Sequence, residues 1–114
     1  MAFEVRERRR AGPVLILELH GRLTMSEGSE VLDSDLQERI ATGERKLLVD
    51  CQNVSAIDSR GIKSLVHGFI SLKKREGALK LLRPGARVRE VLSWTHLDTV
   101  IESFDDEVAA LKSF

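Results

Sequence analysis

The feature that most constrains the fold is an alternation of short apolar runs with segments of helical spacing. Runs of strand length lie at residues 14–19, 46–50 and 79–82. Between these runs, apolar residues recur every three or four positions, as they do on one face of a helix. Strands that are separated by helices need crossover connections, and such connections favour parallel strands. The pattern therefore predicts an α/β fold around a mixed, mostly parallel sheet.

The beginning of the chain has a different pattern, which predicts a hairpin. Residues 3–9 alternate apolar and charged side chains, and Gly12 and Pro13 follow as a turn signal before the run at residues 14–19. We expect an exposed first strand that lies antiparallel to the second at one edge of the sheet. The three arginines at residues 8–10 are interpreted as part of the solvated face of this hairpin.

About four helices and one further strand complete the expected fold. Their signals are apolar stripes, glycine stops and charged residues that suit a helix end. The helices are expected within residues 26–43, from Ile62 toward Gly77, around residues 88–92, and after the three acids at residues 105–107. A last short strand is expected at residues 99–101.

Length and charge narrow the class of protein. A chain of 114 residues fits one domain, here residues 1–114. Eighteen basic and eighteen acidic residues cancel, and there is no tyrosine, so binding to nucleic acid is not expected. Cys51 is the one cysteine of the sequence, so it cannot form an internal disulfide, and we interpret it as an inert buried thiol. Without a signal-peptide core or a membrane-length apolar run, we expect a cytoplasmic protein that does not insert into membranes.

The usual signatures of enzymes and metal sites are missing from the sequence. His20, His67 and His96 are too far apart to suggest a pair of ligands on one element. The eight glycines are scattered and form no phosphate-binding loop. Ser59 lacks a Gly-x-Ser-x-Gly elbow and an evident base. We therefore expect no catalysis, no metal and no cofactor.

The segment Asp58-Ser59-Arg60-Gly61 joins an expected strand to the start of an expected helix, and it supports two interpretations. In the structural one, Asp58 or Ser59 caps the helix, which is worth about 1 kcal/mol. In the functional one, a phosphate on Ser59 adds nearly two negative charges at the positive end of the helix, beside Asp58, and repels a partner without unfolding the domain. Arg60 could pair with that phosphate. The spacing alone leaves both interpretations open.

With Ile57 before it, this segment resembles the motif of anti-sigma-factor antagonists, whose STAS domains carry an apolar residue followed by Asp-Ser-Ser-Gly between a strand and a helix. The resemblance extends along most of the chain. It includes Gly21-Arg22-Leu23 after the second strand, Leu48-Val49-Asp50 and Val54 before the motif, and Gly77 before Leu79-Lys80-Leu81.

The resemblance implies a single STAS domain that binds an anti-sigma factor, often itself a serine kinase, and so releases a sigma factor for transcription. Ser59 is then the phosphoacceptor, and a serine phosphatase restores binding. The implied partner-binding residues are Thr24, Asp58, Ser59, Arg60, Gly61 and Ile62.

Two residues depart from the family pattern. Arg60 stands where a second serine is usual, and Thr24 stands where an acidic residue commonly follows Gly-x-Leu. Both alter charge matching toward a kinase. They keep two alternatives open: an unphosphorylated STAS scaffold of a stressosome-like or lipid-transport assembly, and a regulatory domain that binds a nucleotide or another small ligand. A homodimer is also left open.

Overall fold

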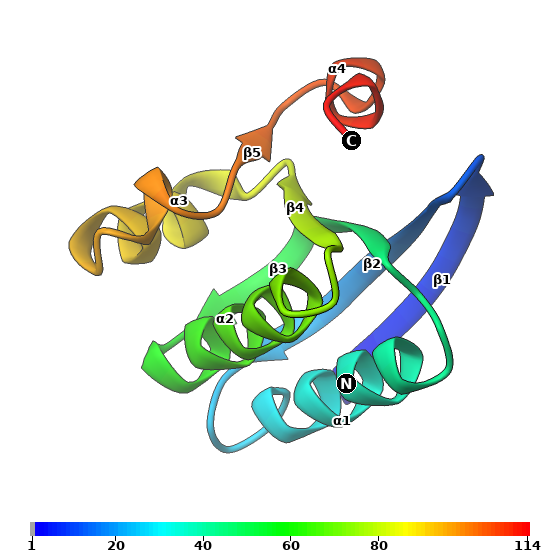
Figure 1. The fold of residues 1–114 in the computed structure, drawn as a ribbon. Coiled ribbons are helices and arrows are strands. Elements are labelled where there is room, and N and C mark those ends of the chain that lie inside the picture. Colours follow the sequence, from blue (N-terminus) through cyan, green and yellow to red (C-terminus); the bar gives the residue numbers. More distant parts are fainter. Residues whose placement is uncertain (1) are drawn as a thin grey trace.

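The structure is a computed structural model that describes residues 2–114 (Figure 1). From β2 onward, strands alternate with helices, as the apolar pattern predicts. In chain order the elements are β1 (Glu4–Ala11), β2 (Val14–Leu23), α1 (Ser29–Ala41), β3 (Lys46–Ile57), α2 (Ser59–Lys73), β4 (Ala78–Leu82), α3 (Gly85–Trp94), the 3-10 helix η1 (Leu97–Thr99), β5 (Ser103–Phe104) and α4 (Glu107–Lys112).

The five strands form one mixed sheet in the order β1-β2-β3-β4-β5. β1 runs antiparallel to β2, and every other neighbouring pair is parallel. Gly12, in the two-residue loop of the hairpin, has a φ of +60°. Glycine adopts this conformation at little cost, and tight hairpin loops commonly require it. The expected edge hairpin and the mostly parallel sheet are both confirmed.

Helices cover both faces of the sheet, and this explains the nearly continuous apolar runs within the central strands. α1, α2 and α3 pack on one face, where they bury alternate strand residues such as Leu15, Leu17 and Val49. α4 lies on the opposite face (Figure 1), where Ala110 packs over Ile16 and Leu48. Because side chains alternate along a strand, a segment that is covered on both faces is apolar at most of its positions.

The prediction of a strand at residues 99–101 is wrong. η1 begins just before this segment, and the N–H groups of Val100 and Ile101 both donate to the C=O of Leu97, at 3.0 and 2.9 Å. These bonds curl the backbone, and Ile101 is buried as part of a turn. An apolar run of three residues is too short to distinguish these conformations. The last strand, β5, follows at Ser103–Phe104.

β3 is longer than its apolar run, and its extra length positions the candidate site. Residues 46–50 pair with both β2 and β4, whereas the second half of β3 pairs with β2 alone. This half ends at Ile57, which lies opposite Leu23 at the end of β2. The loops that leave these two strands therefore start next to each other.

Candidate functional site

Asp58 organises the turn between β3 and α2. Its Oδ1 accepts hydrogen bonds from the N–H groups of Arg60 and Gly61, both at 3.0 Å, and so caps the helix. Its Oδ2 accepts the N–H of Met25, in the loop after β2, at 2.9 Å. Burial alone would raise the pKa of Asp58, but these amide donors outweigh it and hold the pKa below its ordinary value. The carboxylate is thus kept ionised at the start of α2.

Ser59 and Arg60 are the exposed residues of the turn. Ser59 is the first residue of α2, and its hydroxyl has no hydrogen bond to any residue in the described range 2–114. The guanidinium of Arg60 likewise has no ion pair within that range. The sequence allows either Asp58 or Ser59 to cap the helix. In the structure Asp58 is the cap, so Ser59 is not needed for this role.

Two of the expected partner-binding residues are buried. Thr24 is 8% exposed, and its C=O accepts hydrogen bonds from three successive N–H groups, those of residues 27, 28 and 29. Ile62 is 3% exposed and belongs to the main core. Both residues lie next to the turn, yet their side chains contribute to packing more than to its surface.

Gly61 is also buried, because α2 approaches the end of β2 closely there. A Cβ atom on Gly61 would lie 2.1 Å from the C=O oxygen of Leu23. Its absence lets the helix start directly against the strand. The six residues implied by the family resemblance are therefore brought together, with Ser59 and Arg60 on the surface, Asp58 partly exposed, and the other three beneath them.

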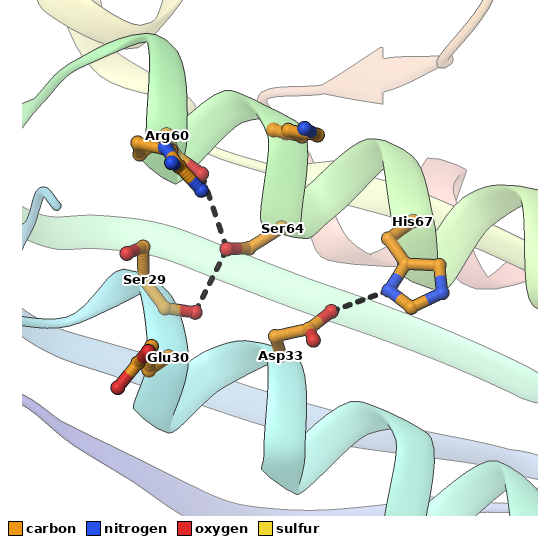
Figure 2. Close-up of a pocket in the computed structure, with 7 residues that line it drawn as sticks. Ser29, Glu30, Asp33, Arg60, Ser64 and His67 are labelled. Atoms are coloured by element: carbon orange, nitrogen blue, oxygen red, sulfur yellow. Dashed lines mark hydrogen bonds and ion pairs between the residues drawn. The ribbon is translucent and has the colours of Figure 1, made fainter.

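A groove of about 240 Å³ runs between α1 and α2, beside the turn (Figure 2). The hydroxyl of Ser64 lies between the C=O groups of Ser29 and Arg60, at 2.8 and 3.1 Å. Farther along, Nδ1 of His67 lies 2.6 Å from Oδ1 of Asp33. The remaining lining residues are Glu30 and Lys63.

Sequence reasoning did not identify this groove. Arg60, Lys63 and His67 recur at helical spacing, and that signal marks one face of α2. Which residues of α1 face them depends on how the two helices are aligned. The spacing of residues within one helix does not reveal this alignment. The groove places both signs of charge within reach of a partner, and Figure 2 shows them on opposite walls.

Cys51 is buried in the core, and burial, with a smaller contribution from the Asp50 charge, raises its pKa to about 12. Within residues 2–114, no cluster of three or more His, Cys, Asp or Glu residues could hold a metal ion. No helix in that range has the length and apolarity needed to cross a membrane.

The fold, with the turn at its strand ends, is that of a known family of domains. The model of the STAS domain family matches residues 3–110, and the chain belongs to this family. A protein of Thermotoga neapolitana named as a homolog of the anti-sigma factor antagonist TM1081 is 33% identical over 70 residues, which cover 61% of this chain. The match spans 62% of that protein, less than two thirds of its length.

Solved structures show the same fold. The crystal structure of TM1081 from Thermotoga maritima, named as an anti-sigma factor antagonist, has a TM-score of 0.86 at 22% identity, over 97% of this chain and 92% of that one. SpoIIAA of Bacillus in its phosphorylated form has a TM-score of 0.73 at 19% identity, over 99% of this chain and 100% of that one. At these identities the likeness concerns the fold.

Proposed function

We propose that this protein is an anti-sigma factor antagonist that binds its anti-sigma factor through the surface at Ser59 and is switched by phosphorylation of that residue. The observation that carries the proposal is that two neighbouring residues of the turn have different roles. Asp58 makes the capping bonds, and the Ser59 hydroxyl beside it is exposed and free of hydrogen bonds within residues 2–114. A kinase can modify that hydroxyl without removing a bond on which the fold depends.

The electrostatics of the turn support a switch. A phosphate on Ser59 carries nearly two negative charges, which the N-terminus of α2 tolerates because the helix dipole is positive there. The same phosphate would stand next to the ionised Asp58, so the local surface would become strongly acidic. A partner that fits the unmodified surface is then repelled while the domain stays folded.

The proposal gives Ser59 the role of phosphoacceptor in a cytoplasmic regulator of transcription. The kinase would be the anti-sigma factor itself, and a phosphatase would return the antagonist to its binding state. A catalytic serine needs a base that is hydrogen-bonded to its hydroxyl, and Ser59 has no such base among residues 2–114. The related proteins named as anti-sigma factor antagonists support a regulatory role.

Capture from a lysate of the native cells tests the proposal. Tagged wild type, Ser59→Ala and Ser59→Asp are compared, with Ser34→Asp as a control at an exposed helical serine away from the turn. Wild type, Ser59→Ala and Ser34→Asp should retain the same anti-sigma factor, and Ser59→Asp should lose it. After ATP is added to the wild-type complex, mass spectrometry should find one phosphate, on Ser59.

Two results would overturn the switch. One is equal retention of the anti-sigma factor by Ser59→Asp together with an unmodified Ser59 after incubation with ATP. The other is a phosphate on another residue that releases the partner. A stable stoichiometric complex that is indifferent to both Ser59 substitutions would instead favour the unphosphorylated scaffold, which the free cation of Arg60 beside Ser59 also favours.

A further inference from the structure

The two helices that border the groove carry opposite charges. Between its first and last residues, α2 has no acid, and its charged side chains are Arg60, Lys63 and Lys73. α1 carries four acids and a single cation, Arg39. That arginine is already paired, with Asp35 on its own helix and with Glu7 on β1. One helix therefore offers an acidic face and the other a basic face.

The contacts between α1 and α2 fix which residues lie at the same level. The pairs are Ser29 with Ser64, Asp33 with His67, and Gln37 with Ser71, and the partners are 34 or 35 positions apart in each case. A constant separation means that the helices run parallel. Position 30 therefore lies level with position 64, and position 38 lies level with position 72.

The outward side chains at these levels are charged and free. Glu30, Glu38, Lys63 and Lys74 are exposed, and none has an ionic partner among residues 2–114. Glu30 lies near the level of Lys63, and Glu38 lies near the level of Lys74, which is the C-cap residue of α2. The two acids, eight positions apart, and the two cations, eleven positions apart, thus form a short acidic row and a short basic row along the two helices.

Each helix also exposes one aliphatic side chain on its outer side. Val31 of α1 is 45% exposed, and Ile70 of α2 is 44% exposed. These are two of the six large apolar residues exposed in the described part of the chain. These two side chains add a small apolar area to the surface that carries the charged rows.

We propose that this face binds a second copy of the chain, with α1 of each copy lying on α2 of the other. A two-fold axis parallel to the helices exchanges α1 and α2 while it preserves their levels. Glu30 then meets Lys63 of the second copy, and Glu38 meets Lys74 of the second copy. Val31 and Ile70 of the second copy lie at different levels, and each adds apolar area to the interface. Every contact occurs twice, because the interface is isologous.

The dimer should be weak and sensitive to salt. Exposed ion pairs contribute little individually and are screened as ionic strength rises. The face includes Arg60, which also belongs to the Ser59 turn, so self-association would compete with a partner that docks there. The dimer itself does not depend on the proposed function, and its test requires no anti-sigma factor.

Sedimentation equilibrium of the whole chain, at about 50 mM and about 500 mM salt, tests the proposal because these conditions change the screening length several-fold. Wild type should dimerise at low salt and dissociate at high salt. The variants Glu30→Lys/Glu38→Lys and Lys63→Glu/Lys74→Glu should each be monomeric, because like charges then face each other. An equimolar mixture of the two variants should form a heterodimer at low salt, because opposite charges are restored at all four contacts.

A control variant, Arg87→Glu/Lys112→Glu, reverses two exposed cations outside this face and should dimerise like wild type. Circular dichroism confirms that each variant is folded. The proposal is overturned if wild type stays monomeric at low salt up to about 1 mM protein, the range of weak association. It is also overturned if the mixture forms no heterodimer, or if the charge-reversal variants dimerise as wild type does and another face must be responsible.

Discussion

Met25 and Asp58, which are 33 positions apart, are joined by a hydrogen bond of 2.9 Å from the Met25 N–H to Oδ2 of Asp58. The other oxygen of the same carboxylate holds the first N–H groups of α2. One side chain therefore ties the loop after β2 to the start of the helix after β3. The geometry of the Ser59 turn depends on this carboxylate.

Replacing Asp58 by alanine should lower the free energy of unfolding by about 2 kcal/mol, at the upper end for a helix cap, because the bond to Met25 is lost as well. Urea denaturation at neutral pH measures this. Ser59→Ala is the matched control and should change the free energy of unfolding by less than about 0.5 kcal/mol. A loss for Ser59→Ala as large as that for Asp58→Ala would show that the serine is the true cap.

The stabilising effect of Asp58 should depend on pH. Its pKa lies below the ordinary value of 3.8: burial alone would raise it, but the donors from Met25, Gly61 and Arg60 more than offset that effect. A carboxyl whose pKa is lowered by folding stabilises the folded state above the unfolded pKa, and this contribution is lost as pH falls through the folded pKa. Wild type should therefore exceed Asp58→Asn in stability at pH 7, and the difference should shrink as the pH falls below the ordinary value of 3.8 and through the lowered pKa of the folded state.

Urea midpoints of both proteins across this range provide the measurement. A difference between wild type and Asp58→Asn that stays constant from neutral to acidic pH would contradict the role assigned to the ionised carboxylate. The amide of asparagine keeps one acceptor oxygen, so this comparison isolates the charge more cleanly than alanine does.

Much of this fold could be predicted from local pattern. The apolar runs and helical stripes indicate β2, α1, α2 and β4, because each of these elements buries a face whose period is visible in the sequence. The second half of β3 escapes such reasoning, since most of its side chains are exposed or partly exposed and its backbone pairs with β2 alone. β5 is only two residues long, and so has no period to detect.

The candidate site divides in the same way. The turn at residues 58–61 is visible because capping residues at a helix start follow known preferences. The bond between Asp58 and Met25 is not visible, because it depends on the pairing of Leu23 with Ile57 that brings two loops together. The burial of Thr24 has the same origin. Contacts between distant segments depend on how the strands are aligned. This alignment cannot be read from local patterns in one sequence.

Gly61 should tolerate no side chain, because a Cβ there would lie 2.1 Å from the Leu23 oxygen, which belongs to the rigid end of β2. Gly61→Ala should lower the free energy of unfolding by about 2 kcal/mol, as overpacking does. Gly68→Ala, in the same helix, is the control. Its Cβ would lie 2.8 Å from Cδ1 of Leu36, the end of a flexible side chain, so its cost should be smaller. Thermal or urea unfolding that ranks the two variants in the opposite order would contradict this assignment.

Arg8 should matter more than its place in an exposed strand suggests. Its guanidinium lies 3.4 Å from Asp50, 3.2 Å from Glu18 and 2.7 Å from Glu107 at the start of α4. The Asp50 side chain is 4% exposed, and without Arg8 it retains only the ion pair with Arg83 in the described part of the chain. Arg8→Met should therefore lower the free energy of unfolding by about 2 kcal/mol, because a buried carboxylate loses part of its compensation.

The neighbouring cation provides the control for Arg8. Arg10 pairs with Glu44 on the surface, and half of its side chain is exposed. Arg10→Met should leave the free energy of unfolding nearly unchanged, because solvent screens such pairs. Urea unfolding of both variants distinguishes the two positions. Equal effects would mean that the arginines of β1 form a uniform solvated face, and that Arg8 does not help to hold α4 against the sheet.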